Sequence, residues 1–108
     1  MDEVRTLIGL LREAETLLRS HGVDYWAEWL ARDAAQIEAD EFEGVEDLLG
    51  AFGGMGSFND LVIYPGNGHN IREGDVAAVN RHLDELRSDI YATAKQLEDK
   101  GRLPHRAA

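Results

Sequence analysis

The 108-residue sequence contains no cysteine. Disulfide bonds, thiolate nucleophiles and cysteine-ligated zinc are therefore excluded, and the absence is consistent with a reducing cytoplasm, where we expect the protein to lie. The sequence also has no apolar run of about eighteen residues, the length that a helix needs to span a bilayer. Its N-terminal segment lacks the basic start and compact apolar stretch of a secretory signal.

Basic residues are scarce as well. Lys and Arg number 11 against 21 Asp and Glu, which gives a formal net charge of −10. Such an excess repels phosphate backbones and anionic lipid, so nucleic acids and membrane surfaces are excluded as partners. The excess of acidic over basic residues is concentrated in one half of the chain: residues 1–52 carry 13 acids and 4 bases. No Lys or Arg lies between Arg32 and Arg72, and six acids fall within ten positions: Glu38, Asp40, Glu41, Glu43, Glu46 and Asp47.

Apolar residues, at 44% of the chain, are frequent enough for a packed core. We expect a single helical domain over residues 1–108, with an ordered core at about 3–100. Four segments, near residues 4–18, 24–37, 43–52 and 76–97, repeat apolar residues at steps of three and four, which is typical of amphipathic helices. Gly101 and Pro104 are expected to end the last one. These patterns predict an all-α, four-helix, mostly antiparallel domain.

One short extended segment is expected between the third and fourth helices. Leu61 to Tyr64 form an apolar run bounded by turn residues. Its backbone groups need partners, so it either pairs with residues near His69–Arg72 or lies extended over the helices.

Three glycines, Gly53, Gly54 and Gly56, precede that segment. They could bare backbone N–H groups to a phosphate, but the segment lacks the lysine of a Walker loop and the G-x-G-x-x-G spacing of a dinucleotide site. The interpretation that we favour is a tight turn, with Met55 and Phe58 packed inward.

Ser57, Asp60 and His69 supply the residue types of a nucleophilic triad, and Asn59 adds a polar side chain. The surrounding sequence is not a nucleophile elbow, so we assign no catalytic residue and expect no enzyme. The alternative is a small-molecule-binding or hydrolytic protein that uses the loops Gly53–Asp60 and Asn67–Asn70. The four histidines show no paired ligand spacing, so we expect neither a metal nor a cofactor.

Asp33 stands out because it falls within the apolar stripe of the second helix, between Leu30 and Ile37. A buried carboxylate needs a partner, and we expect Arg87, Asn80 or loop N–H groups to hold it. The alternative is a carboxylate that lines a pocket with its aromatic neighbours Tyr25, Trp26 and Trp29.

The stretch Leu48-Leu49-Gly50-Ala51-Phe52-Gly53-Gly54-Met55-Gly56-Ser57-Phe58-Asn59-Asp60-Leu61 resembles the signature of a small bacterial family of helical proteins of unknown function. The likeness extends over most of residues 5–95. It implies a bacterial origin and an all-helical fold, and it transfers no catalytic residue. Small acidic proteins of this kind are suspected to be immunity partners of bacterial toxins.

The six acids within residues 38–47, which we call the acidic segment, carry the functional expectation. Asp40 and Glu43 stand at capping-box spacing before the third helix, and a general need for solubility could also favour the charge. However, a dense acidic patch speeds encounter with a basic protein. Toxins directed at nucleic acid carry basic surfaces. We therefore expect a non-catalytic cytoplasmic binding protein of the immunity-inhibitor type, with the acidic segment as its partner-binding surface.

Overall fold

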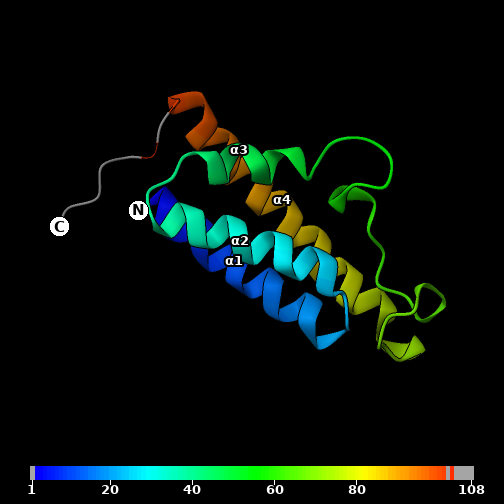
Figure 1. Cartoon of the computed structure of the whole chain (residues 1–108). Coiled ribbons are helices and arrows are strands. Elements are labelled where there is room, and N and C mark those ends of the chain that lie inside the picture. The colour runs from blue at the N-terminus through cyan, green and yellow to red at the C-terminus, as the bar shows by residue number, and fades with distance from the viewer. Residues whose placement is uncertain (1, 102, 104–108) are drawn as a thin grey trace.

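The computed structural model describes residues 2–101 and 103. Its four α-helices are α1 (Glu3–Ser20), α2 (Asp24–Glu38), α3 (Glu43–Gly50) and α4 (Val76–Lys100) (Figure 1). Three single turns of 3-10 helix, η1 (Phe58–Asp60), η2 (Pro65–Asn67) and η3 (Glu73–Asp75), lie between α3 and α4. The described residues contain no strand, which confirms the all-α prediction. None of the helices in this part of the chain has the length and apolar character required to cross a bilayer.

The long helices α1, α2 and α4 lie side by side, and the short α3 bridges α2 and α4 (Figure 1). A three-residue turn, 21–23, reverses the chain between α1 and α2, with Gly22 at a φ of +72°. At the other end of the molecule, Lys100 Nζ lies 2.7 Å from Glu3 Oε1, so α4 ends beside the start of α1. Gly101 follows α4 at a φ of +72°, whereas Pro104 lies outside the described residues.

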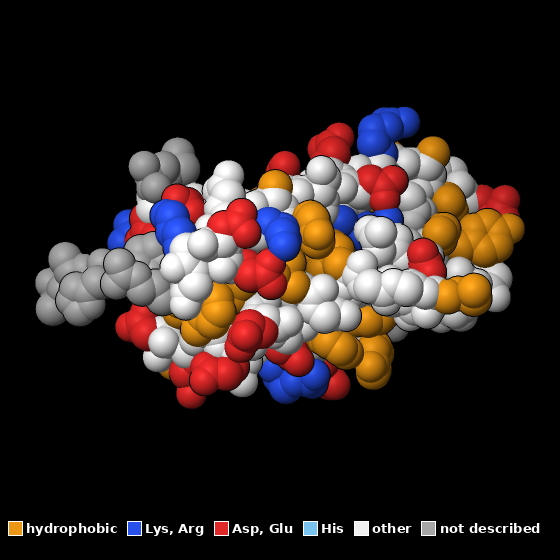
Figure 2. Space-filling model, turned by 90° about the horizontal axis from the view of Figure 1, so that it is seen from above, with side chains coloured by type: hydrophobic (Ala, Val, Ile, Leu, Met, Phe, Trp, Pro, Cys, Tyr) orange, Lys and Arg blue, Asp and Glu red, His pale blue; other side chains and the backbone are white. Residues whose placement is uncertain are grey.

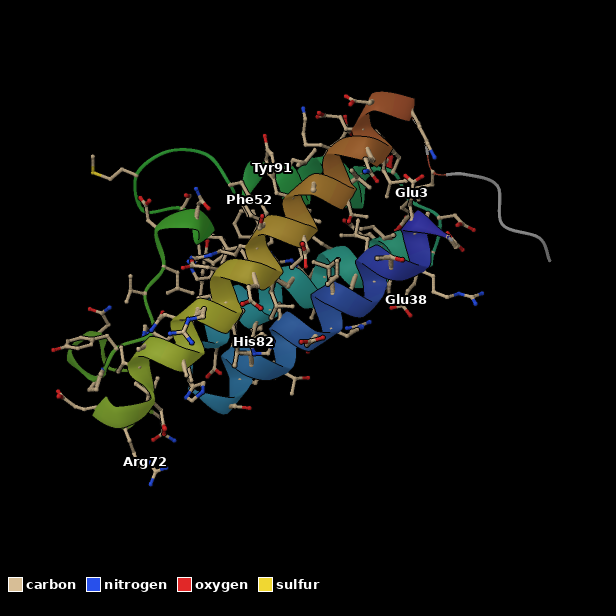
Figure 3. All side chains as sticks on the ribbon, turned by 180° about the vertical axis from the view of Figure 1, so that it is seen from behind. Glu3, Glu38, Phe52, Arg72, His82 and Tyr91 are labelled. Atoms are coloured by element: carbon tan, nitrogen blue, oxygen red, sulfur yellow. The ribbon has the colours of Figure 1, made fainter. Side chains whose placement is uncertain are left out.

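The core is built from the apolar stripes that the helical period predicts. Leu7, Leu11 and Leu18 of α1 are fully buried against side chains of α2 and α4. Just after α3, the Phe52 ring packs against the Tyr91 ring of α4, with centroids 5.4 Å apart (Figure 3).

The connection between α2 and α3 is only four residues long, and Asp40 lies at its sharpest point. Asp40 has a φ of +62°, and it is the only described residue other than glycine with a positive φ. The Asp40 N–H donates to Ile37 O and the Glu41 N–H donates to Gln36 O, which is the Schellman closure of a helix end. Asp40 therefore ends α2. The predicted capping box is wrong, since α3 starts after Phe42 without a side-chain cap.

The connection between α3 and α4 follows the second of the two expected courses. Residues 61–64 are extended and lie over the helices rather than in a sheet. The Asn80 side chain of α4 accepts from the Ile63 N–H and donates to Ile63 O, both at 2.8 Å. Arg87 of α4 donates to the carbonyls of Phe58 and Leu61, at 2.8 and 2.9 Å. Two side chains thus replace the partner strand that these backbone groups do not have.

The glycine turn has the predicted backbone but not all of the predicted packing. Gly54 and Gly56 have φ values of +76° and +79°, and Phe58 is fully buried. Met55, however, is 99% exposed, so its expected inward packing is wrong. It lies at the tip of the turn, between two glycines that direct the chain outward.

Candidate functional site

A hollow of about 480 Å³ lies between α2 and α3, and most of its charge is negative. We call it the α2–α3 hollow. Figure 2 shows the molecule from above, where several acidic side chains lie over the half that contains α3. The lining residues come from the two helices alone: Arg32, Asp33 and Gln36 from α2, and Glu43, Glu46 and Asp47 from α3. Three residues of the acidic segment therefore line the hollow.

Gly44 allows the two helices to approach closely at one end of the hollow. It is buried, and a Cβ added to it would lie 2.9 Å from Gln36 Cβ and 3.0 Å from Asp33 O. Real Cβ atoms keep a greater distance, so only glycine permits this approach of α3 to α2. The first turn of α3 is thereby placed against the C-terminal half of α2.

Asp33 closes the inner end of the hollow. It is fully buried, as the sequence predicts. Neither carboxyl oxygen has a hydrogen bond of normal geometry with any residue that the structure describes. The predicted pairing of Asp33 with Arg87, Asn80 or loop N–H groups is wrong, because Arg87 and Asn80 hold the α3–α4 connection. The alternative, a pocket carboxylate beside Tyr25, Trp26 and Trp29, is right in that Asp33 lines a hollow and Trp29 acts on its charge, but none of the three aromatic residues lines that hollow.

The electrostatic setting of Asp33 is unusual for a carboxyl group. Burial, and secondarily the neighbouring Asp47 carboxyl, raise the pKa of Asp33 to about 9 against the smaller opposing effects of Arg32 and Trp29. Asp47 and Trp29 thus lie near enough to act on the charge of Asp33, although neither completes a hydrogen bond of normal geometry with it. At neutral pH the group is accordingly a neutral acid.

Two other members of the acidic segment have structural roles. Glu38 accepts from Arg12 of α1 at 2.6 Å, so its charge is already paired, and Asp40 ends α2. The exposed carboxyls of Glu41, Glu43, Glu46 and Asp47 remain, and none of them forms an ion pair with a described residue.

Helix dipoles account for only part of this charge. Glu43 and Glu46 lie in the first turn of α3, where negative charge is stabilising. Glu41 follows the last turn of α2, where negative charge is destabilising and no basic side chain offsets it. Asp47 lies beyond the first turn of α3 and repels negative charge on Asp33. Folding therefore explains Glu43 and Glu46 but not Glu41 and Asp47.

The predicted loop residues lie at a second, shallower hollow of about 260 Å³. Ser57, Asp60 and His69 all line it, together with Asn67 and Trp26. Their hydrogen bonds do not form a triad. The Asp60 carboxylate accepts from the Gly56 N–H at 2.9 Å, and His69 Nδ1 accepts from the Tyr64 N–H at 3.1 Å.

That bond fixes the tautomer of neutral His69. Because Nδ1 is the acceptor, Nε2 carries the proton and has no lone pair with which to act as a base toward Ser57. Ser57 Oγ is buried without a hydrogen-bond partner among the described residues. Asn59 lies apart from this group and lines a hollow of about 410 Å³ with Arg87 and Tyr91. The loop groups thus fit backbone support better than acyl transfer.

Metal ligands are not clustered in the part of the chain that the structure describes. No group of three or more His, Cys, Asp or Glu side chains there is arranged to hold a metal ion. Sequence reasoning missed Arg32 and Gln36, which line the α2–α3 hollow, and Gly44, which brings its two helices together. Gly44 carried a signal, since a glycine inside a short helix indicates a close contact. Arg32 and Gln36 carried none, because their place depends on where α3 crosses α2.

Comparison with known proteins places these features in a family. Searches of curated proteins and of solved structures gave no match. A family model does match residues 19–72, a segment that contains α2, α3, the glycine turn and every predicted site residue. Since this segment is half of the 108-residue chain, the protein belongs to that family, which is described as a domain of unknown function (DUF6966).

Proposed function

We propose that this protein is a non-catalytic cytoplasmic binding protein that uses the acidic segment to engage a basic protein, as an immunity-type inhibitor does. The observation that carries the proposal is the set of four exposed carboxyls, Glu41, Glu43, Glu46 and Asp47, that form no ion pair with a described residue. Three of them, Glu43, Glu46 and Asp47, line the α2–α3 hollow together with a buried fifth carboxyl, Asp33.

The energetics support binding over general solubility. A solubilising surface mixes charges of both signs and spreads them. Here like charges are concentrated where they destabilise the fold, because Glu41 lies at the negative end of α2 and Asp47 lies beside Asp33. A cationic partner would remove both penalties on binding. The same field would raise the rate of encounter with such a partner.

The test is affinity capture from a lysate of the native host, followed by kinetics on the captured protein. The bait variant is the triple reversal Glu41→Lys, Glu46→Lys and Asp47→Lys, whose helicity is checked by circular dichroism. Its matched control reverses three exposed acids of α4 and changes the net charge equally: Glu85→Lys, Asp89→Lys and Asp99→Lys.

A basic protein retained by the wild type and by the control, and lost with the triple reversal, is the expected result. Its association rate should fall by about tenfold or more with the reversal, and it should also fall with rising salt. If the two triple variants retain the same proteins equally, or if the rate is indifferent to both reversal and salt, the acidic segment is not a binding surface.

A further inference from the structure

Asp33 is the feature of the α2–α3 hollow that the proposed function does not use. Charge at the rim is enough to steer a partner, and the rim acids provide it. A fully buried carboxyl adds nothing to long-range steering, and without hydrogen bonds it costs stability. Buried polar groups without partners are rare in folded proteins, and each of them needs a specific explanation.

The surroundings of Asp33 show which kind of group would satisfy it. Asp33 lines the hollow from α2 and Asp47 lines it from α3, so each of the two helices contributes a carboxyl group to this space. Glu43 and Glu46 add acceptors from α3, and Gln36 adds a side-chain amide from α2. A complementary group must therefore be cationic and must carry several N–H donors.

The one basic residue of the hollow does not meet this need. The Arg32 guanidinium carbon lies 6.0 Å from the centre of the Trp29 ring, so the guanidinium lies over the indole. Arg32 forms no ion pair within 4.0 Å of a carboxyl in the part of the chain that the structure describes. It only moderates the effect of its acidic neighbours on Asp33.

We infer that the α2–α3 hollow receives one arginine side chain of the partner protein, whose guanidinium donates to the carboxylates of Asp33 and Asp47. The inference rests on the proposed function and names the chemical group that the acidic segment captures. A guanidinium suits the hollow better than an ammonium group, because its five donors form a planar fork that two carboxylates can share. It is also more weakly hydrated, so entering a partly buried space costs less.

When the guanidinium binds, it takes the place of the proton on the Asp33 carboxyl. Asp33 holds a proton at neutral pH, because its pKa is raised to about 9. The titratable groups that face it in the hollow are Arg32 from α2 and Glu43, Glu46 and Asp47 from α3. When the guanidinium pairs with Asp33, that proton leaves to solvent. Binding of the arginine side chain should therefore release up to one proton per site at pH 7.

The test uses acetyl-arginine amide as the probe, with the full-length isotope-labelled protein observed by NMR. The expected result is a saturable shift of the Trp29 indole N–H and the Gly44 amide signals. Acetyl-citrulline amide, a neutral analogue of the same shape, should cause neither shift. Calorimetry in buffers of different ionisation enthalpy should report the released proton.

The variants compare positions inside and outside the hollow. Asp33→Asn should weaken binding of the probe by about tenfold or more, because it removes a charge-assisted acceptor while keeping the shape. Glu85→Gln removes a carboxylate from an exposed position on α4, outside the hollow and the acidic segment, and it should weaken binding by no more than about twofold. Asp47→Asn is the second variant, since it lies at an exposed position where folding is not at risk, and it should weaken binding at least about fivefold.

The outcomes separate this inference from the proposed function. Equal losses for Asp33→Asn and Glu85→Gln would overturn the inference, because the net negative charge of the protein alone would then hold the probe. Identical shifts with Mg²⁺ would also overturn it, in favour of a general cation site. Either result leaves the proposed function intact if the triple reversal still abolishes capture of the basic protein. Loss of the proposed function would instead show as unchanged capture by the triple reversal.

Discussion

The α3–α4 connection and the α2–α3 hollow each contain one buried ionisable side chain, and the two side chains differ in their hydrogen bonds. In the α3–α4 connection, Arg87 is 8% exposed, donates to two loop carbonyls and pairs with the exposed Asp84 of its own helix. In the α2–α3 hollow, Asp33 is 0% exposed and has no hydrogen bond of normal geometry with a described residue. Burial is nearly the same, but only Arg87 has its hydrogen bonds made within the fold.

This contrast separates a side chain whose hydrogen bonds hold the fold together from one whose hydrogen-bonding groups the fold leaves unused. Arg87 fastens a long segment that has no strand to pair with, and its loss would leave two carbonyls without donors. Asp33 fastens nothing. The same domain can satisfy a buried charge completely, so the condition of Asp33 is a property of its site rather than of a poorly packed fold. Substitutions of these two side chains, and of glycines near each of them, test that contrast.

Replacement of Arg87 should have the largest effect. Arg87→Met keeps the apolar stem but removes the donors to Phe58 O and Leu61 O, and we expect a loss of about 3–5 kcal/mol in the free energy of unfolding. Urea unfolding measures the change. The control Arg81→Met lies on the same helix at an exposed position, and it should change stability by less than about 0.5 kcal/mol. Similar losses for both variants would show that Arg87 is not a fastening point.

Asp33→Asn should instead stabilise the protein, and the gain in the free energy of unfolding should depend on pH. The unfolded chain releases this proton near the ordinary pKa of 3.8, while the folded protein holds it up to a pKa of about 9. Between these values the folded state binds the additional proton, so the contribution of Asp33 to stability falls as the pH rises. Relative to the wild type, Asp33→Asn should gain about 2–4 kcal/mol between pH 5 and pH 8.

Urea titrations at several pH values measure that difference. Glu41→Gln, which removes an exposed carboxyl of the same segment, is the control, and its difference from the wild type should stay nearly flat over the same range. A flat difference for Asp33→Asn as well would mean that Asp33 is ionised in the folded protein, against the raised pKa.

Gly44→Ala should cause the next largest change in stability, and this change is a loss. A Cβ at this position would lie about 3 Å from Gln36 Cβ, Asp33 O and Ile37 Cγ1, and two of these atoms belong to rigid parts of α2. Helix α3 must then move away, at a cost of about 1–3 kcal/mol. Gly50→Ala in the last turn of α3 meets no atom within 4 Å, so it serves as the control. Equal thermal melts for the two variants would contradict the close contact.

The smallest effect is expected at the glycine turn. Gly54→Ala and Gly56→Ala should each cost about 1 kcal/mol, because alanine resists the φ values of +76° and +79°. The neighbouring Gly53 has no positive φ and open space around it, so Gly53→Ala should be neutral or slightly stabilising. If all three variants have the same melting temperature, the turn accommodates a side chain at each position and its glycines are not required for the fold.

The parts of this molecule that follow from local sequence were predictable. Apolar residues at helical spacing fix which face of each helix is buried, and they do so whatever the neighbours are. The same angular argument placed Asp33 inside, because its position between Leu30 and Ile37 is set by the helix alone. Positive φ at Gly54 and Gly56 also followed from local chemistry.

What failed depends on contacts between distant segments. The partners of Arg87 and Asn80 are loop carbonyls whose positions no periodic pattern specifies, so pairing these side chains with Asp33 was a reasonable but wrong prediction. The α2–α3 hollow exists because Asp40 turns the chain at positive φ and Gly44 admits a close approach. Neither event follows from charge or hydrophobic spacing, so the acidic segment was located while the hollow was missed.

The contact between Lys100 and Glu3, at 2.7 Å, brings the end of the last helix to the start of the first. A linker of a few residues could therefore join them, and new termini could be opened beside the fully exposed Met55. In this circular permutant α4 precedes α1, so the longest-range helix pair becomes a pair of sequence neighbours, and the lower contact order should speed folding. Because α2 and α3 remain consecutive in the permuted chain, the α2–α3 hollow should form as before.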